Sequence, residues 1–347
     1  KKVLASVLAG LAMVGAGAAG TPVQAVYSDS GSAINISPNA KPGNSVSQNS
    51  VVVGYQNDST GGPSNENGKI IYGANNTANR ESSLAVGNQN TASNKSTSAI
   101  GVGNTASGEA SVALGNANTA SGDRSIAIGS GANATQGAAI AIGRQAEATG
   151  SSAVAVGYVN KAKKNVAVAL GVNNNVDGEQ STAVGSSNTI ATNANQATVI
   201  GRSNNINRAG SFVGGFSNTT NGERNVAVGS GNTTTGEDSI GIGTNTIAGT
   251  GKTIAIGSVA SNDGTTLQTI ARGNDTINAA TGQVNNIFAL AIGNGAQADG
   301  KAKSASGMIA IGQEVLADNN NTVAIGVKTK ATGNNGLAVG SYTQALG

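Results

Sequence analysis

One four-residue pattern recurs along most of this chain and limits what it can fold into. The pattern is apolar, alanine, apolar, glycine, and it recurs every fourteen residues as Ile126-Ala127-Ile128-Gly129, Ile140-Ala141-Ile142-Gly143 and Val154-Ala155-Val156-Gly157. A pattern sustained at one period is typical of a solenoid, in which each repeat packs only on its neighbours. The closing glycine, here called the register glycine, marks each coil. The predicted register glycines are Gly54, Gly73, Gly87, Gly103, Gly115, Gly129, Gly143, Gly157, Gly171, Gly185, Gly201, Gly215, Gly229, Gly243, Gly257, Gly273, Gly293, Gly312, Gly326 and Gly340.

Each pattern predicts a β-strand, because apolar residues two apart with a small residue between them have the period of a pleated chain. Both faces of such a strand are apolar, so both are expected to be buried. A thin roll has room inside for one of the two faces, so the other is expected to look outward and to be covered by self-association. The residues assigned to the core of the roll or to the interface between chains are Ile126, Ala127, Ile128, Ile140, Ala141, Ile142, Val154, Ala155 and Val156.

A second, shorter strand is predicted in the rest of each coil. Five residues past the register glycine lie small or apolar residues such as Ala120 and Ile190, which form a further inward row. Three residues past it lie asparagines such as Asn118 and Asn204, whose stacked amides are expected to hydrogen-bond along the axis. Two strands and two turns in fourteen residues predict a flattened coil with parallel pairing between neighbours.

Composition excludes several functions. The 347 residues include 52 glycines and no histidine, cysteine or tryptophan, so the most common catalytic bases, thiol nucleophiles, zinc ligands and all disulfides are missing. No catalytic residue, metal site or cofactor is predicted. Lys1 and Lys2 are two of the 20 basic residues against 17 acidic ones, and without them the charges nearly balance. That balance argues against a nucleic-acid surface.

The N-terminal segment is expected to be a secretory signal peptide spanning residues 1–25. Two lysines precede an apolar run over residues 3–19, and small residues lead to Ala25, after which cleavage is expected. A membrane-spanning helix is the alternative, which the shortness of the run disfavours. Residues 26–49 are polar and lack periodicity, so they are predicted to be a loop-like lead-in. The repeats occupy residues 50–347.

The repeats resemble a known family. The segments "SVALGNANTASG" at 111–122, "SIAIGSGANAT" at 125–135 and "AIAIGRQAEATG" at 139–150 are similar to the head repeats of trimeric autotransporter adhesins, the YadA-like head, over residues 50–347. This resemblance implies a left-handed parallel β-roll, a homotrimer and a place on the outer membrane of a Gram-negative bacterium. No heptad stalk or membrane-anchor segment follows Gly340, so the chain is expected to be a fragment of a longer adhesin.

Other repeat folds fit less well. Calcium-binding β-rolls repeat Gly and Asp every nine residues, whereas aspartates such as Asp123 and Asp177 are irregular here. Hexapeptide acyltransferases have a six-residue repeat and use histidine. An ice-binding solenoid needs a regular threonine row, for which only "NTTTG" at 232–236 is a local candidate.

Two sets of residues are candidate contacts for a receptor. The position after the register glycine is expected to face water, and at Arg144, Tyr158, Val172, Arg202 and Phe216 it combines arginine, aromatic and aliphatic residues typical of binding anchors. The coils that overrun the period, at 55–69, 274–288 and 294–307, are expected to bulge outward as loops. The alternative interpretation is that the row is merely exposed and that the three loops are merely solvated, without a ligand in either case. A local anomaly also falls at 211–216, "SFVGGF", where Gly214 replaces an apolar residue and Phe212 is expected to refill the space.

The predicted function is attachment by a non-enzymatic adhesin head. The resemblance implies binding to collagen, fibronectin or immunoglobulin-class receptors such as carcinoembryonic-antigen-related adhesion molecules, with avidity from three copies. The alternative is a structural spacer or a self-association module without a host receptor. An enzyme is the third and least supported class.

Overall fold

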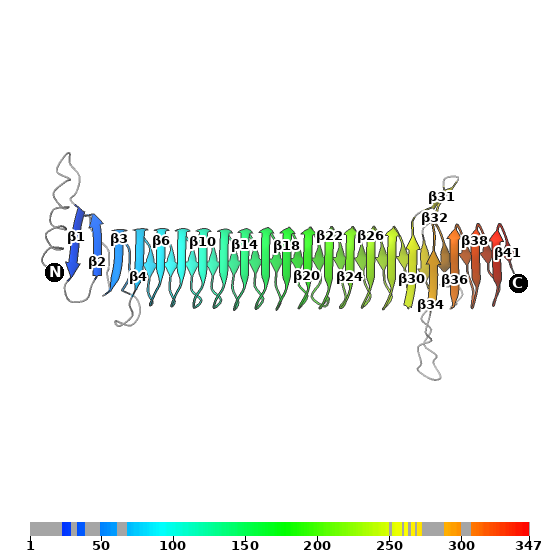
Figure 1. The fold of residues 1–347 in the computed structure, drawn as a ribbon, viewed down its shortest axis with the longest axis horizontal. Helices are drawn as coiled ribbons and strands as arrows, with labels where there is room; N and C mark the ends of the chain where they lie inside the picture. The colour runs from blue at the N-terminus through cyan, green and yellow to red at the C-terminus, as the bar shows by residue number, and fades with distance from the viewer. Residues whose placement is uncertain are drawn as a thin grey trace, which may run out of the picture. The chain divides into compact units, whose positions relative to one another are not determined.

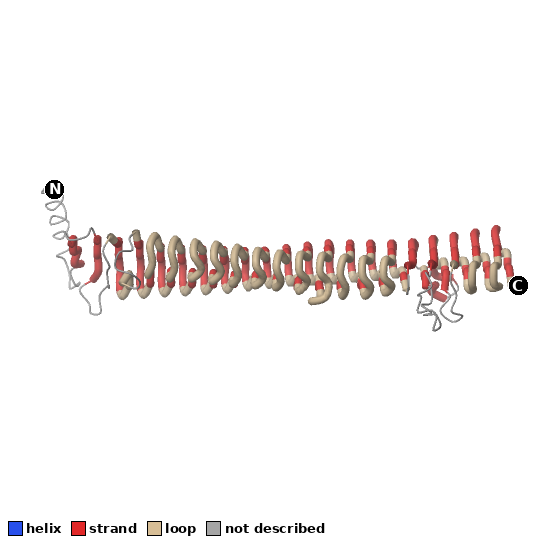
Figure 2. Tube along the Cα trace, turned by 90° about the horizontal axis from the view of Figure 1, so that it is seen from below, coloured by secondary structure: helices blue, strands red, loops and turns tan. Residues whose placement is uncertain are grey.

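The computed structural model describes residues 23–28, 33–38, 49–60, 68–249, 252–258, 260–262, 265–267, 269–272, 288–299 and 307–346. The chain divides into two units, Lys1–Val166 and Ala167–Gly347. Each unit is built from the same coil, in which one long strand and one short strand are joined by two turns (Figure 1). Figure 2 shows strands and turning loops alternating within each unit.

The first unit begins with an antiparallel pair, β1 (Val23–Ser28) and β2 (Ala33–Pro38). Its long strands are β3 (Ser50–Tyr55), β4 (Lys69–Ala74), β6 (Leu84–Asn88), β8 (Ser98–Val102), β10 (Val112–Asn116), β12 (Ile126–Ser130), β14 (Ile140–Arg144) and β16 (Val154–Tyr158). Its short strands are β5 (Thr77–Ala78), β7 (Thr91–Ala92), β9 (Thr105–Ala106), β11 (Thr119–Ala120), β13 (Asn133–Ala134), β15 (Glu147–Ala148) and β17 (Lys161–Ala162).

The second unit repeats this plan. Its long strands are β18 (Val168–Val172), β20 (Thr182–Ser186), β22 (Thr198–Arg202), β24 (Phe212–Phe216), β26 (Val226–Ser230), β28 (Ile240–Thr244), β30 (Lys252–Gly257), β34 (Phe288–Ile292), β36 (Met308–Gln313), β38 (Val323–Val327) and β40 (Leu337–Ser341). Its short strands are β19 (Asn175–Val176), β21 (Thr189–Ile190), β23 (Asn205–Ile206), β25 (Thr219–Thr220), β27 (Thr233–Thr234), β29 (Ile247–Ala248), β33 (Ile270–Arg272), β35 (Gln297–Asp299), β37 (Leu316–Ala317), β39 (Lys330–Ala331) and β41 (Gln344–Ala345). A hairpin of β31 (Ala260–Asn262) and β32 (Thr265–Leu267) is inserted.

Successive coils pair in parallel and in exact repeat register. Ala127 of β12 lies opposite Ala141 of β14, and the short strands pair likewise, with Ala134 of β13 opposite Ala148 of β15. Equivalent residues therefore stack directly above one another along each unit. The all-β parallel solenoid with coils of about fourteen residues is confirmed.

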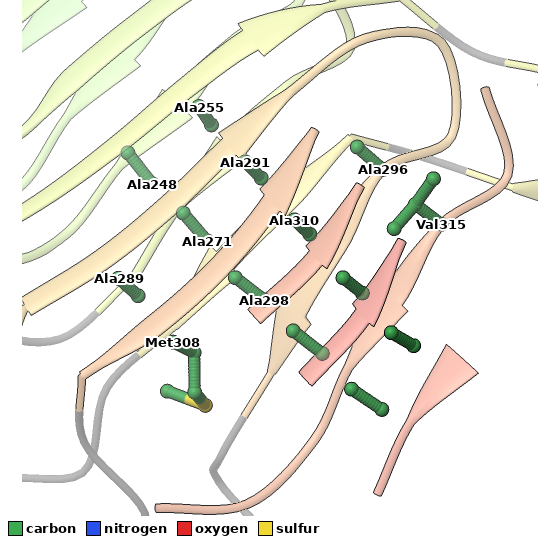
Figure 3. Packing of buried hydrophobic residues seen from close by; sticks show 14 residues of the cluster. Ala248, Ala255, Ala271, Ala289, Ala291, Ala296, Ala298, Met308, Ala310 and Val315 are labelled. Atoms are coloured by element: carbon green, nitrogen blue, oxygen red, sulfur yellow. The ribbon is translucent and has the colours of Figure 1, made fainter. Parts of the chain in front are cut away.

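The residue two positions before the register glycine points inward, and in most long strands it is alanine. Val, Ile or Gly takes its place at Val52, Ile71, Val199, Val213 and Gly241. Ala127, Ala141 and Ala155 are all 0% exposed, and so are alanines of the short strands such as Ala134 and Ala148. In the second unit Figure 3 shows the same arrangement, with alanine methyl groups from long and short strands meeting between the two sheets. The expectation that one face of the long strand looks outward in the single chain is confirmed, because the interior holds only the inward face. Its burial by self-association stays a prediction.

The predicted asparagine ladder is confirmed in both units. In the first unit, Nδ2 of Asn104 donates to Oδ1 of Asn90 at 2.9 Å, and Nδ2 of Asn118 donates to Oδ1 of Asn104 at 2.8 Å. In the second unit, Nδ2 of Asn188 reaches Oδ1 of Asn174 at 2.9 Å. Each amide thus satisfies a buried neighbour one coil away, which a polar group in a dry interior requires.

One predicted register glycine is wrong, and so is the long strand predicted before another. Gly101, not Gly103, lies opposite Gly87 and Gly115, so the spacing there is regular and Gly103 lies in the following turn. Gly273 lies outside the described residues, and β33, just before it, pairs in the short-strand sheet. The long strand that follows β30 is β34, with Ile256 opposite Ile292.

The lead-in also differs from the predicted loop. β1 and β2 form a hairpin within residues 23–38, and β2 pairs in parallel with β3 through Ile34 and Val51. These strands were not predicted because they lie outside the fourteen-residue pattern. Ala25, after which cleavage is expected, lies within β1.

Candidate binding surface

An outward apolar stripe runs along the long strands of each unit. It consists of the residues one and three positions before the register glycine, which point away from the buried alanine between them. In the isolated chain Leu114 is 39% exposed, Ile142 36% and Ile200 51%. Ile126, Ile128, Ile140, Val154 and Val156 also lie on this stripe, partly exposed. A stripe repeated on coil after coil exceeds the isolated apolar residues that a monomer usually shows.

In the first unit, the row after the register glycine brings Arg144 and Tyr158 together. Both side chains are exposed, Tyr158 by 44%. The guanidinium carbon of Arg144 lies 5.5 Å from the centroid of the Tyr158 ring, within the range of a cation–π contact. The predicted exposure of this row is therefore confirmed at these two residues.

In the second unit, the same row contains Val172, Ser186, Arg202 and Phe216 on neighbouring long strands. Val172 is 45% exposed and Phe216 42%. The guanidinium carbon of Arg202 lies 4.6 Å from the centroid of the Phe216 ring. The row thus presents an arginine stacked on an aromatic ring, with an aliphatic residue two coils away.

The stacked pairs define the chemistry that the row presents to solvent. An exposed cation–π contact contributes about 0.5–1 kcal/mol and holds the arginine flat against the ring. Within the described part of the chain neither Arg144 nor Arg202 forms an ion pair, so their N–H groups are free to meet a carboxylate or another planar acceptor. Since the position is polar in most other coils, these pairs are the most distinctive features of the row.

A third pair was missed by sequence reasoning. Nζ of Lys328 lies 5.9 Å from the centroid of the Tyr342 ring, and both residues occupy the second position after the register glycine. That position adopts a positive φ, 51° at Lys328 and 59° at Tyr342. Their spacing of fourteen residues is the signal from which the pair could have been predicted.

A charged cluster on the opposite turn was also missed. Arg224 Nε lies 2.6 Å from Asp238 Oδ1, Nη1 3.3 Å from Glu223 and Nη2 3.5 Å from Glu237. The hydrogen bond from Arg224 is the main cause that lowers the pKa of Asp238 below its ordinary value. The cluster is exposed, so water and salt screen it strongly.

The candidate loops are only partly described. Of the segment 55–69, residues 55–60 and 68–69 are described. Lys69 is fully buried and its Nζ donates to the carbonyl oxygen of Ser59 at 3.0 Å. Most of 274–288 and the 300–306 part of 294–307 lie outside the described residues. Binding of a receptor by these loops therefore stays a prediction.

The described residues contain no group of three or more His, Cys, Asp or Glu side chains that could hold a metal ion. Among these same residues, no helix is long and apolar enough to cross a membrane.

The family comparison agrees with the repeat. A model of the YadA head domain repeat, which describes two copies, matches residues 81–104, 92–118, 106–132, 120–143, 134–159, 167–188, 221–246, 235–260 and 317–343. No curated protein matches the chain. The matched residues lie in both units.

Proposed function

Because the chain belongs to the family of YadA-like head domains of trimeric autotransporter adhesins, we propose that three copies assemble into a head that attaches the bacterium to a host surface. The family implies an adhesin at the bacterial cell surface. The proposal adds a homotrimer of left-handed rolls, export by a signal peptide over residues 1–25, a place at the outer membrane and attachment through several copies of one weak site.

The outward apolar stripe carries the trimer proposal. Leu114, Ile142 and Ile200 are more than a third exposed in the isolated chain, and burying such residues contributes about 25 cal/mol per Å² of apolar surface. A covering partner must offer apolar groups at the same period. Another copy of this chain meets that requirement directly.

Light scattering tests the assembly. The expected mass is three times that of one chain, and Ile142→Asp is expected to lower it because a carboxylate is placed in the interface. Ser130→Asp, at an exposed position of the neighbouring coil, is the matched control and is expected to remain trimeric. A monomeric wild-type head, or equal loss of assembly in both variants, contradicts the proposal.

Host attachment is supported by the stacked pairs on the row. Tyr158→Ala and Phe216→Ala are each expected to weaken binding by about 1–3 kcal/mol, as truncated anchors commonly do. A panel of collagen, fibronectin and immunoglobulin-class receptors, presented in monovalent form, avoids avidity between the three copies. Far-UV circular dichroism checks that both variants keep their β signal.

Two results would assign the binding site elsewhere or indicate that the head has no host receptor. Unchanged affinity in both variants, together with lost binding after shortening 55–69, 274–288 or 294–307, would assign binding to the loops. A head that binds nothing in the panel would favour the second candidate, a structural spacer or self-association module. The outward apolar stripe supports that candidate, because other copies of this chain can cover it without any host ligand.

A further inference from the structure

One coil of the second unit breaks the outward apolar stripe. Its other described long strands have Val, Ile, Leu or Thr three residues before the register glycine, and Val, Ile or Leu one residue before it. β24 instead has Phe212 and Gly214 at these positions. Phe212 is 42% exposed, so the change lies on the surface that the proposed trimer would bury.

Gly214 is not required by the backbone of its own chain. Its φ is not in the left-handed region, and a Cβ placed there would meet nothing closer than Cε1 of Phe212 at 3.8 Å and the methyl groups of Val228 at 3.9 Å. These are ordinary van der Waals distances, so an alanine would fit the strand without strain. Glycine destabilises the interior of a strand, so a reason is needed for its presence at position 214. We look for that reason in the outward face of β24, where glycine leaves no side chain.

Phe212 covers that surface. Its ring edge lies 3.8 Å from where the Cβ of residue 214 would be, which confirms that the ring refills the space. The coil therefore presents an aromatic ring beside a glycine, where its neighbours present two aliphatic side chains. This makes it distinguishable from the coils on either side.

A uniform stripe cannot define how three chains align along their axis. Sliding one chain by a single coil, about 4.8 Å, would place each aliphatic residue against an equivalent one. The two alignments would bury nearly the same area, so the free energy difference between them would be small. Repetitive interfaces of this kind need one residue that disfavours the shifted alignment.

We propose that Phe212 and Gly214 fix the axial register of the assembled head by requiring that the three β24 strands lie at one level. In a shifted assembly the ring of one chain would meet Ile200 or Val228 of another, with overpacking at the ring and a void at the unmatched glycine. This inference rests on the proposed trimer, and the occupant of the stripe is a second and a third copy of this chain.

The test measures register separately from assembly. The natural chain has no cysteine, so Ser186→Cys and Thr244→Cys chains can each carry one spin label and be refolded together. These residues follow register glycines on either side of β24, four coils apart, or about 19 Å along the axis. A slip of one coil changes that axial separation by about 5 Å, which pulsed electron spin resonance detects as a shifted distance between chains.

The register-erasing variant is Phe212→Val with Gly214→Val, which reproduces the valines of β26. The expected result is a trimer of unchanged mass whose single set of distances between chains becomes several, displaced by one coil spacing. Adding Val226→Phe with Val228→Gly to this variant moves the pair by one coil and is expected to restore a single set.

Each outcome decides the proposal. Unchanged distances in the valine variant, or its dissociation into monomers, overturns the role in register. If the double variant does not fold, Gly214→Ala alone tests the space beside Phe212, because an alanine side chain fits there. It is expected to broaden the distances partly, and unchanged distances again overturn the proposal. A monomeric wild-type head would instead refute the trimer before any register is measured.

Discussion

Replacing Asn104 by alanine tests whether the asparagine ladder stabilises the fold. Nδ2 of Asn104 lies 2.9 Å from Oδ1 of Asn90, 3.0 Å from the carbonyl oxygen of Ile100 and 2.8 Å from that of Gly115. Its Oδ1 accepts from the backbone N–H of Asn118 at 3.0 Å and from the Asn118 amide at 2.8 Å. The side chain is fully buried, so each of these groups would lose a partner in a dry interior.

The expected cost follows from the number of bonds. The amide has two hydrogens shared among three oxygens, and its oxygen accepts two bonds, so about four hydrogen bonds are lost. A net contribution of about 1 kcal/mol each gives an upper estimate of about 4 kcal/mol. Relaxation of the neighbours lowers it, and we expect a loss of about 2–4 kcal/mol per chain in the free energy of unfolding.

Chemical denaturation followed by far-UV circular dichroism measures this loss at fixed protein concentration, because association contributes to apparent stability. The matched control is Asn88→Ala, which removes an exposed asparagine from the long strand one coil earlier. It is expected to change stability by less than about 0.5 kcal/mol. If both variants unfold at the same denaturant concentration, the ladder is not a source of stability and the reasoning is refuted.

Three further changes test other parts of the coil. Gly143→Ala is expected to prevent native stacking, because its Cβ would lie 2.0 Å from the carbonyl oxygen of the next register glycine; a cooperative transition like that of wild type would contradict this. Val159→Asn is expected to raise the free energy of unfolding by about 1 kcal/mol, since Val159 has a φ of 55° and asparagine tolerates that region better; an unchanged or lower denaturation midpoint would contradict it. Asp238→Asn is expected to remove a small, salt-sensitive loss of stability at acid pH. Because Arg224 lowers the pKa of Asp238 in the fold, its stabilisation is present above the unfolded pKa and is lost as pH falls through the folded pKa; identical pH profiles of variant and wild type at low salt would contradict this.

The coil could be predicted from the sequence because two independent features of the repeat indicate it. Alternation around Ala127 predicts a strand, and the return of the pattern at Ala141 predicts that the strands stack. The asparagine row added a third, independent signal, since amides at a constant offset can bond only if the coils lie in register. Local pattern and long-range pairing agree in this fold, so few alternatives compete.

The predicted alignment of the repeats was wrong where two glycines fitted the pattern equally well. Ile100-Gly101-Val102-Gly103 offers two glycines at the end of an apolar pair. The offset of Asn104 distinguishes them, because an inward asparagine lies three residues past the true register glycine, Gly101. At Ile270-Ala271-Arg272 the letters match the long strand, yet β33 pairs with short strands, because an inserted hairpin displaces it. A single-chain pattern contains no information about such an insertion.

Which face of the long strand turns inward was decided by volume rather than hydrophobicity. The two sheets approach closely enough that alanine methyl groups such as Ala289 and Ala298 meet between them (Figure 3). In some coils larger residues occupy the same inward rows, such as Ile71, which lies opposite Ala85 in the long strands, and Ile206 in the short strands. Composition alone cannot give the distance between sheets, so the direction of the isoleucines had to come from the structure.

The same geometry separates the positions that stabilise the coil from the outward positions proposed to contact a ligand. Inward rows are constrained by the narrow space and by the ladder, so a substitution such as Ala141→Asp would disrupt the coil before it affected any ligand. Outward positions after the register glycine carry no such constraint, and there the sequence varies between serine, arginine and aromatic residues. Arg202 and Phe216 lie on neighbouring strands, one coil apart, so a ligand that meets one meets the other. Loss of binding in Phe216→Ala with an unchanged unfolding transition would therefore identify recognition by this row, whereas joint loss of binding and stability would identify a structural role.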